Sequence, residues 1–312
     1  MQVAPQGGIY NYFHSLLPPL SLAPFMPRTP LYSISLFFKG LKLEEELGAK
    51  LFDRSRQPIE PTSIGALVVS QAKQILYDLN SITRIIEEEQ QSLTGRLNIA
   101  VLPTIAPYLL PRVFPIWKKE LAGLEIHVSE MQTSRCLASL LSGEIDMAII
   151  ASKAETEGLE DDLLYYEEFL GYVSRCEPLF EQDVIRTTEV NPHRLWLLDE
   201  GHCFRDQLVR FCQMKGLHER QTAYSGGSME AFMRLVESGQ GITFIPQLTV
   251  EQLSPSQKEL VRPFGMPRPV REVRLAVRQD YSRRKLREQL IGLLRSAVPS
   301  DMHKLQTGQH LA

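Results

Sequence analysis

Two of the four cysteines in the chain, Cys203 and Cys212, stand nine positions apart in a stretch with the apolar spacing of a helix. The apolar positions and the glycine that can end this helix are Phe204, Leu208, Phe211, Cys212 and Gly216. Nine steps along a helix span about 13 Å, whereas a disulfide requires Cα atoms within about 7 Å. The helix would therefore have to unfold before the two sulfurs could bond, which is the physical outline of a redox switch.

Cys203 is the thiol that we expect to react first. A helix N-terminus, the neighbouring His202 and the cation Arg205 favour its thiolate, while three acidic neighbours oppose this: Asp199, Glu200 and Asp206. Cys212, among apolar residues, is expected to stay protonated until the helix frays and then to act as the resolving thiol. The alternative interpretation is that both cysteines are small buried apolar residues, and their spacing alone does not decide between the two.

The motif GHCFRDQ, followed by FC, resembles the signature of the OxyR branch of the LysR-type transcriptional regulators. The order of segments resembles that family from about Leu41 to Val298, and most members sense small organic effectors and lack this cysteine pair. The resemblance implies a cytoplasmic transcriptional activator, not an enzyme, that senses hydrogen peroxide by oxidation of Cys203 and a disulfide with Cys212. It also implies reduction by a thiol protein such as glutaredoxin or thioredoxin.

The composition of the 312 residues is that of an ordinary soluble protein, with 43% hydrophobic and 23% charged residues. A net charge of −3 gives no overall basic signature, so any contact with nucleic acid must come from a local patch. The scattered cysteines form neither a secreted disulfide framework nor a zinc motif. We expect no metal, no cofactor and no membrane segment, since no apolar run reaches roughly 18 residues.

Residues 1–40 do not fit the family pattern. Prolines interrupt most runs long enough for a helix: Pro5, Pro18, Pro19, Pro24, Pro27 and Pro30. Apart from His14, the basic residues here are Arg28 and Lys39, and the recognition helix of a helix-turn-helix is missing. We predict disorder for this segment, and a frameshift or a start in the wrong frame upstream of about residue 41.

Residues 41–62 resemble the remnant of a winged helix-turn-helix domain, comprising the end of the recognition helix and the wing. Arg54 and Arg56 are predicted to contact phosphate from the wing, with a solvated loop as the alternative. Contacts with phosphate groups add affinity for DNA but do not distinguish one base sequence from another. Residues that would read base edges fall in the unmatched part, which leaves specific DNA binding by this chain open.

Residues 63–92 are predicted to form a linker helix with a heptad seam of Val68, Ala72, Ile75, Leu79, Ile82 and Ile86. A lone amphipathic helix packed on its own domain is the competing interpretation. The resemblance implies a homodimer formed through this helix, or a homotetramer built from such dimers.

The rest of the chain alternates strand and helix patterns, which predicts an α/β fold with a largely parallel sheet. The order resembles a two-lobed periplasmic-binding-protein-like domain with crossings near Glu167 and near Pro263–Pro269. The resemblance assigns residues 96–167 and 268–299 to lobe I and residues 168–267 to lobe II. Residues 300–312 form a polar tail.

Ligands of such folds bind beyond the carboxyl ends of strands. Thr104 and Thr133 follow strands at that level, although a threonine there is also a common helix cap. The resemblance assigns a peroxide pocket to Thr104, Thr133, His202, Gln207 and Arg278, with Arg205 and Asp206 beside it. Without the resemblance, Arg278 is a surface arginine and Asp206 a complement to the helix dipole. Cys136 and Cys176 are predicted to be structural.

Two other functions remain open from the sequence. One is an ordinary LysR-type regulator that binds a small organic effector and whose cysteines are incidental. The other is a thiol peroxidase, although the chain has no CxxC motif and a helix held by three apolar side chains would recycle slowly.

Overall fold

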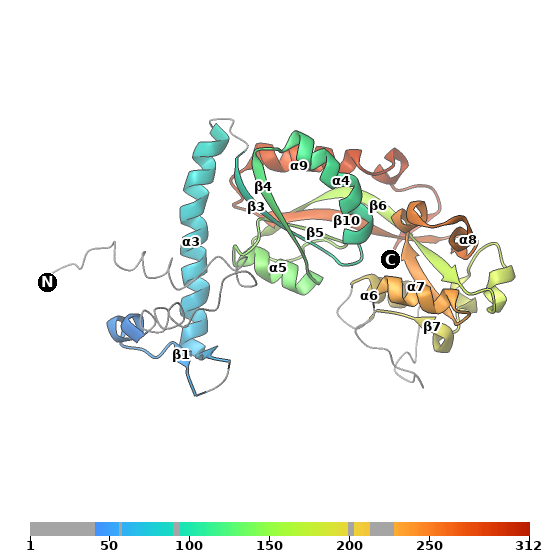
Figure 1. Ribbon diagram of the computed structural model, residues 1–312, viewed down its shortest axis with the longest axis horizontal. Helices are drawn as coiled ribbons and strands as arrows, with labels where there is room; N and C mark the ends of the chain where they lie inside the picture. Colours follow the sequence, from blue (N-terminus) through green and yellow to red (C-terminus); the bar gives the residue numbers. More distant parts are fainter. Residues whose placement is uncertain (1–40, 56–57, 90–93, 199–202, 213–227) are drawn as a thin grey trace. The chain divides into compact units, whose positions relative to one another are not determined.

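The computed structural model describes residues 41–55, 58–89, 94–198, 203–212 and 228–312 (Figure 1). The chain forms two compact units, a small N-terminal one that contains most of a long helix and a larger one that contains the main sheet. Our predictions for residues 1–40, Arg56 and His202 lie outside the described residues. No helix in the described ranges has the length and hydropathy needed to cross a bilayer.

The N-terminal unit combines a helical segment at 41–47, a two-stranded antiparallel sheet and the start of the long helix. Its elements are β1 (Phe52–Asp53), β2 (Glu60–Pro61) and α3 (Ser63–Glu89). The buried carboxylate of Glu44 accepts hydrogen bonds from the backbone N–H groups of Leu51 and Phe52 and from the guanidinium of Arg54. Burial alone would raise the pKa of Glu44, but these bonds lower it below its ordinary value. Arg54 is thus tied to Glu44 on the predicted wing.

Gly65 lets α3 begin against the backbone of the segment that precedes β1. A Cβ atom there would lie 1.8 Å from the carbonyl oxygen of Leu51. We expect Gly65→Ala to destabilise this unit by about 3 kcal/mol, because backbone must shift to admit the methyl group. Thermal unfolding checks this, with Gly292→Ala as the control: Gly292 lies inside a helix, and an added Cβ there would meet no other element among the described residues within 4 Å. Equal melting temperatures for the two variants would contradict the prediction.

Helix α3 lies within the range predicted for the linker helix, whose role in dimerisation stays a prediction, and it carries an exposed apolar face. Four of the six predicted seam positions are exposed, and these are Ile75, Leu79, Ile82 and Ile86. Val68 is half-buried and Ala72 is buried. Exposed isoleucine and leucine side chains along one face of a helix are typical of a helix that pairs with a second helix in a coiled coil.

The main sheet has the strand order β4-β3-β5-β10-β6-β8-β7, with β11 beside β10 and β9 beside β6. Its strands are β3 (Gly95–Val101), β4 (Leu124–Glu130), β5 (Met147–Ile150), β6 (Leu159–Val173), β7 (Leu195–Trp196), β8 (Ile242–Pro246), β9 (Val261–Pro263), β10 (Arg268–Arg278) and β11 (Gln309–Leu311). The predicted α/β class is confirmed. The sheet is mixed rather than largely parallel, because β10 runs antiparallel to both β5 and β6.

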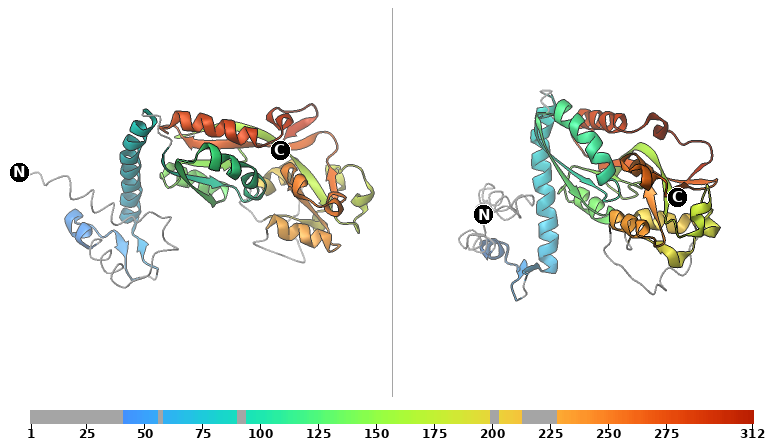
Figure 2. Two further views of the ribbon diagram at one scale, coloured as in Figure 1. Left: turned by 45° about the horizontal axis from the view of Figure 1, so that its top comes forward. Right: turned by 45° about the vertical axis from the view of Figure 1, so that its right-hand side comes forward.

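The long strands β6 and β10 join two groups of strands. At one end they continue the group of β3, β4 and β5, and at the other end β6 pairs with β8 and β9. The helices are α4 (Ala106–Glu120), α5 (Thr133–Leu141), α6 (Cys203–Phe211), α7 (Met229–Glu237), α8 (Pro255–Lys258) and α9 (Arg284–Ser296). α4 and α9 lie next to each other over the first group (Figure 1, Figure 2). The predicted polar tail contains a 3-10 turn at Ser300–His303 and strand β11.

Candidate redox site

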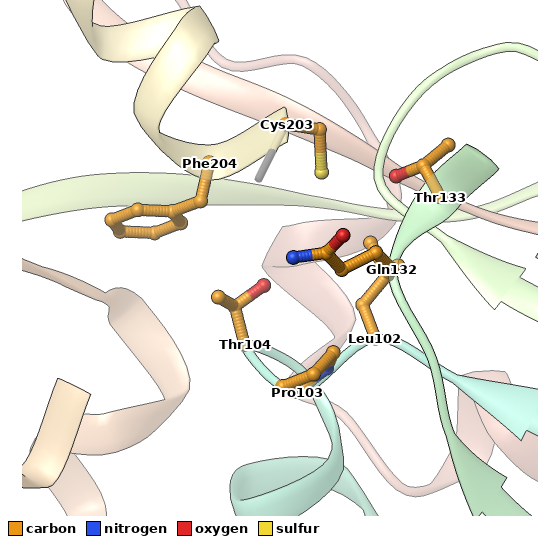
Figure 3. A pocket seen from close by; sticks show the side chains of 7 residues that line it. All are labelled: Leu102, Pro103, Thr104, Gln132, Thr133, Cys203 and Phe204. Carbon is orange, nitrogen blue, oxygen red and sulfur yellow. The ribbon is translucent and has the colours of Figure 1, made fainter. Parts of the chain in front are cut away.

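The carboxyl ends of β3 and β4 define one side of a small pocket. These strands are parallel and in register, with Val101 opposite Glu130, so the segments that follow them meet at one edge of the sheet. The lining residues come from those segments and from the start of α6: Leu102, Pro103, Thr104, Gln132, Thr133, Cys203 and Phe204. Figure 3 shows the sulfur of Cys203 and the hydroxyl of Thr133 directed into the same space.

The two predicted threonines have different hydrogen-bonding states. Thr104 is buried, and its hydroxyl oxygen accepts a hydrogen bond of 2.9 Å from Nη1 of Arg271. The Oγ1 atom of Thr133 is buried and has no hydrogen-bond partner among the described residues. Because a buried hydroxyl without a partner is costly, the Thr133 hydroxyl retains unused hydrogen-bonding capacity beside the pocket.

Arg271 is the buried cation of the site, with a side chain that is 1% exposed. It pairs with Glu167 of β6 at 2.7 Å and also donates to the carbonyl oxygen of Thr104. Its guanidinium carbon lies 5.1 Å from the ring centroid of Phe204, the residue after Cys203. One side chain on β10 therefore contacts Thr104 of the pocket lining, Glu167 of β6 and Phe204 of the cysteine helix.

Arg278, which the sequence suggested for the pocket, lies seven residues further along β10, opposite Leu159. Its guanidinium donates to the carboxylate of Asp280 and to the carbonyl oxygen of Leu141, and it is not among the lining residues. Arg271, by contrast, bonds the lining residue Thr104, and the role that we predicted for Arg278 stays a prediction. Both arginines follow valines or other apolar residues in β10, so their local patterns do not distinguish them.

The other predicted residues on α6 are not among the residues that line the pocket. Gln207 is buried and donates a hydrogen bond of 2.7 Å to the carbonyl oxygen of Ala151, while its own Oε1 is buried without a partner among the described residues. Asp206 is exposed and lies 3.9 Å from the guanidinium of Arg205. Gln207 thus ties the cysteine helix to the end of β5, and Asp206 is positioned to orient Arg205.

Both cysteines of the motif are free, and the helix separates them as predicted. The backbone N–H of Cys212 donates to the carbonyl oxygen of Leu208 at 2.9 Å, so the helical pattern continues to Cys212. Cys203 is partly exposed and Cys212 is buried, and burial raises the pKa of Cys212 to about 12. Cys212 is therefore protonated at neutral pH and cannot attack until the helix opens.

Packing holds α6 in place along its length. Leu208 is fully buried, and the ring of Phe204 lies 4.8 Å from that of Phe169 in β6. Phe211 meets Phe264 edge-on at 6.1 Å. Opening the helix must break these contacts, so the step that brings Cys212 to Cys203 costs free energy.

The remaining cysteines differ in burial. Cys136 is buried on α5, where its thiol donates weakly to the carbonyl oxygen of Met131 at 3.6 Å, and burial is the main factor that raises its pKa to about 12. Cys176 is exposed. In the described part of the chain, no group of three or more His, Cys, Asp and Glu residues could hold a metal ion.

Residues 90–299 match the family described as LysR substrate binding domain. The hydrogen peroxide-inducible genes activator of Dickeya chrysanthemi is 31% identical over 264 residues, which are 85% of this chain and 86% of that protein. An OxyR mutant from Porphyromonas gingivalis, a solved structure, is 98% identical and covers 70% of this chain and 100% of its own, with a TM-score of 0.68. An OxyR mutant from Corynebacterium glutamicum with hydrogen peroxide bound is 26% identical and covers 99% of both chains, with a TM-score of 0.63. The chain belongs to the LysR family of transcriptional regulators, in its OxyR branch.

Proposed function

We propose that this chain is a redox-sensing transcription regulator that detects hydrogen peroxide by oxidation of Cys203 and disulfide formation with Cys212. The observation that carries the proposal is the state of the two thiols. Cys203 faces a pocket with an unpartnered hydroxyl, while Cys212 is buried at the far end of the same helix. The relatives named for peroxide-inducible activation and the peroxide-bound OxyR structure support it.

In the first step, the Cys203 thiolate attacks one oxygen of hydrogen peroxide and the O–O bond breaks. The second oxygen leaves as hydroxide and takes up a proton to become water, while Cys203 becomes a sulfenic acid. Thr104 accepts a hydrogen bond from Arg271, so its own hydroxyl hydrogen is available to the peroxide, as is that of Thr133. Arg271 supplies positive charge close to the departing oxygen.

In the second step, the Cys212 sulfur attacks the sulfenic acid, the S–S bond forms and water leaves. This step requires α6 to open, since the helical rise keeps the two residues about 13 Å apart. Opening removes Phe204 from Phe169 and Arg271 and breaks the bond between Gln207 and Ala151. The oxidised chain therefore differs from the reduced chain in the packing around both long strands.

For oxidation of Cys203 to change transcription, the chain must bind DNA and other protein chains. We propose a homodimer formed through the exposed apolar face of α3, with a homotetramer as the larger alternative, and DNA bound through the remnant of the winged domain. The bond of Arg54 to Glu44 positions its guanidinium on the wing. A thiol reductant such as glutaredoxin or thioredoxin would return the disulfide to the free thiols.

Thr133→Val should slow the oxidation of Cys203 about tenfold, the cost of one hydrogen bond of about 1–1.5 kcal/mol lost from the transition state. The rate is measured as sulfenic acid formation in a Cys212→Ser background, so that the second step does not interfere. Thr243→Val is the control, because the hydroxyl of Thr243 is also shielded from solvent but bonds the carbonyl oxygen of Trp196. Equal slowing in the two variants would remove Thr133 from the pocket chemistry.

The proposed function is tested by mass spectrometry of the reduced full chain after stoichiometric peroxide. We expect a Cys203–Cys212 disulfide in the native chain, a trapped Cys203 sulfenic acid in Cys212→Ser and no reaction in Cys203→Ser. An unmodified Cys203 at micromolar peroxide would overturn the proposal. Steady turnover of peroxide with a reductant, at many cycles per subunit, would identify a peroxidase instead.

A further inference from the structure

Strand β11 is fixed at both ends to the long strand β10. Its residues Gln309, His310 and Leu311 lie opposite Arg268, Pro269 and Val270 in parallel register. The backbone N–H of Arg268 donates to the carbonyl oxygen of Gly308 at 2.8 Å, and that of Ala312 donates to the carbonyl oxygen of Val270 at 3.0 Å. The segment is thus part of the sheet.

A side-chain contact adds a second attachment. The amide of Gln309 donates to the carboxylate of Glu168 at 2.6 Å, and the same carboxylate pairs with Arg268 at 2.8 Å. Glu168 is a buried residue of β6. β11 is therefore attached to both long strands where they lie side by side.

Between Gln309 and Leu311, the side chain of His310 points to the other face of the strand. There its ring lies 6.5 Å from the ring of Phe211, at 44°. Phe211 also contacts Phe264, which stacks on Phe244 at 5.4 Å. His310 thus contacts the last residue of α6, immediately before Cys212.

We infer that β11 is a clamp on the Cys212 end of α6 and sets the rate at which the disulfide forms. This inference rests on the proposed function. Attack by Cys212 requires Phe211 to leave its contacts with Phe264 and His310, whereas attack of Cys203 on peroxide leaves that end of the helix unchanged. The clamp therefore acts on the second step alone, and it prolongs the lifetime of the Cys203 sulfenic acid.

The test measures the two steps separately in full-length protein. Sulfenic acid formation is followed in a Cys212→Ser background, and disulfide formation is followed by quenching with an alkylating reagent and mass spectrometry. His310→Ala should leave the first rate unchanged and increase the second about threefold to tenfold, the range that one aromatic contact accounts for. Deletion of residues 306–312 should increase the second rate at least as much.

Leu311→Ala is the matched control, because Leu311 neighbours His310 on the same strand and its side chain is exposed. It should change neither rate. The clamp is refuted if His310→Ala forms the disulfide at the native rate, or if Leu311→Ala accelerates it equally. Both of those outcomes leave the proposed function standing, whereas the absence of any disulfide in the native chain would remove the clamp and the proposed function together.

Discussion

Replacing Arg271 with methionine should destabilise the larger unit by about 3–5 kcal/mol and slow the oxidation of Cys203 by about 100-fold. The loss of stability follows because Glu167 would keep its charge in a buried position without its partner. The loss of rate follows because the variant removes both the charge near the departing oxygen and the bond that orients Thr104. Chemical denaturation and sulfenic acid trapping measure the two effects.

A second substitution separates the two effects of Arg271. Arg271→Met with Glu167→Gln removes the unpaired charge and should restore most of the stability, but the slow oxidation should persist. Arg278→Met is the matched control on the same strand, since its guanidinium bonds Asp280 and Leu141 and should not affect the oxidation rate. A slow Arg278→Met with a native rate in Arg271→Met would return the role to Arg278.

Leu208→Ala should speed disulfide formation by at least about 30-fold once Cys203 is oxidised. Leu208 is fully buried at the centre of α6, and the loss of a buried leucine side chain costs about 2–5 kcal/mol. If that cost falls on the closed helix and not on the opened one, each 1.4 kcal/mol accelerates opening about tenfold. Disulfide formation after a pulse of peroxide measures the effect.

The control for Leu208→Ala is Arg210→Ala, on the exposed face of the same helix. Arginine and alanine both favour helices, so this change should leave the opening of α6 nearly unaffected. If the two variants formed the disulfide at the same rate as the native chain, the opening of α6 would not limit the second step.

The cysteine helix was predictable from sequence because its signals are local. Apolar spacing places Phe204, Leu208 and Phe211 on one face, and the structure buries that face as expected. The positions of Thr104 and Thr133 were predictable for a similar reason, since each follows a strand pattern directly. Local sequence therefore predicts the positions of Thr104, Thr133 and Cys203 at the ends of their elements, while their roles toward peroxide stay a prediction.

The first half of β6 was not predictable, because its sequence LEDDLLYYEE lacks the alternation of a half-buried strand. The structure pairs its acidic residues with cations from elements more than 100 positions later. Asp161 bonds Arg274 of β10, and Asp162 bonds Arg287 of α9. Such charges cannot be assigned to a strand before their partners are known.

Arg271 was missed for the same physical reason. A buried arginine requires a buried partner, and Glu167 lies 104 positions away on the neighbouring strand. The sheet was predicted as largely parallel because alternation of strands and helices does not show that the chain crosses between the two groups and returns antiparallel along β10.

Disulfide formation requires α6 to open before Cys212 can reach Cys203, and amide hydrogen exchange across residues 204–212 tests this requirement most directly. The reduced chain and peroxide-treated Cys212→Ser should retain helical protection, while the peroxide-treated native chain, with its disulfide located by mass spectrometry, should lose it. A disulfide between Cys203 and Cys212 in a chain whose helix remains protected would contradict the account.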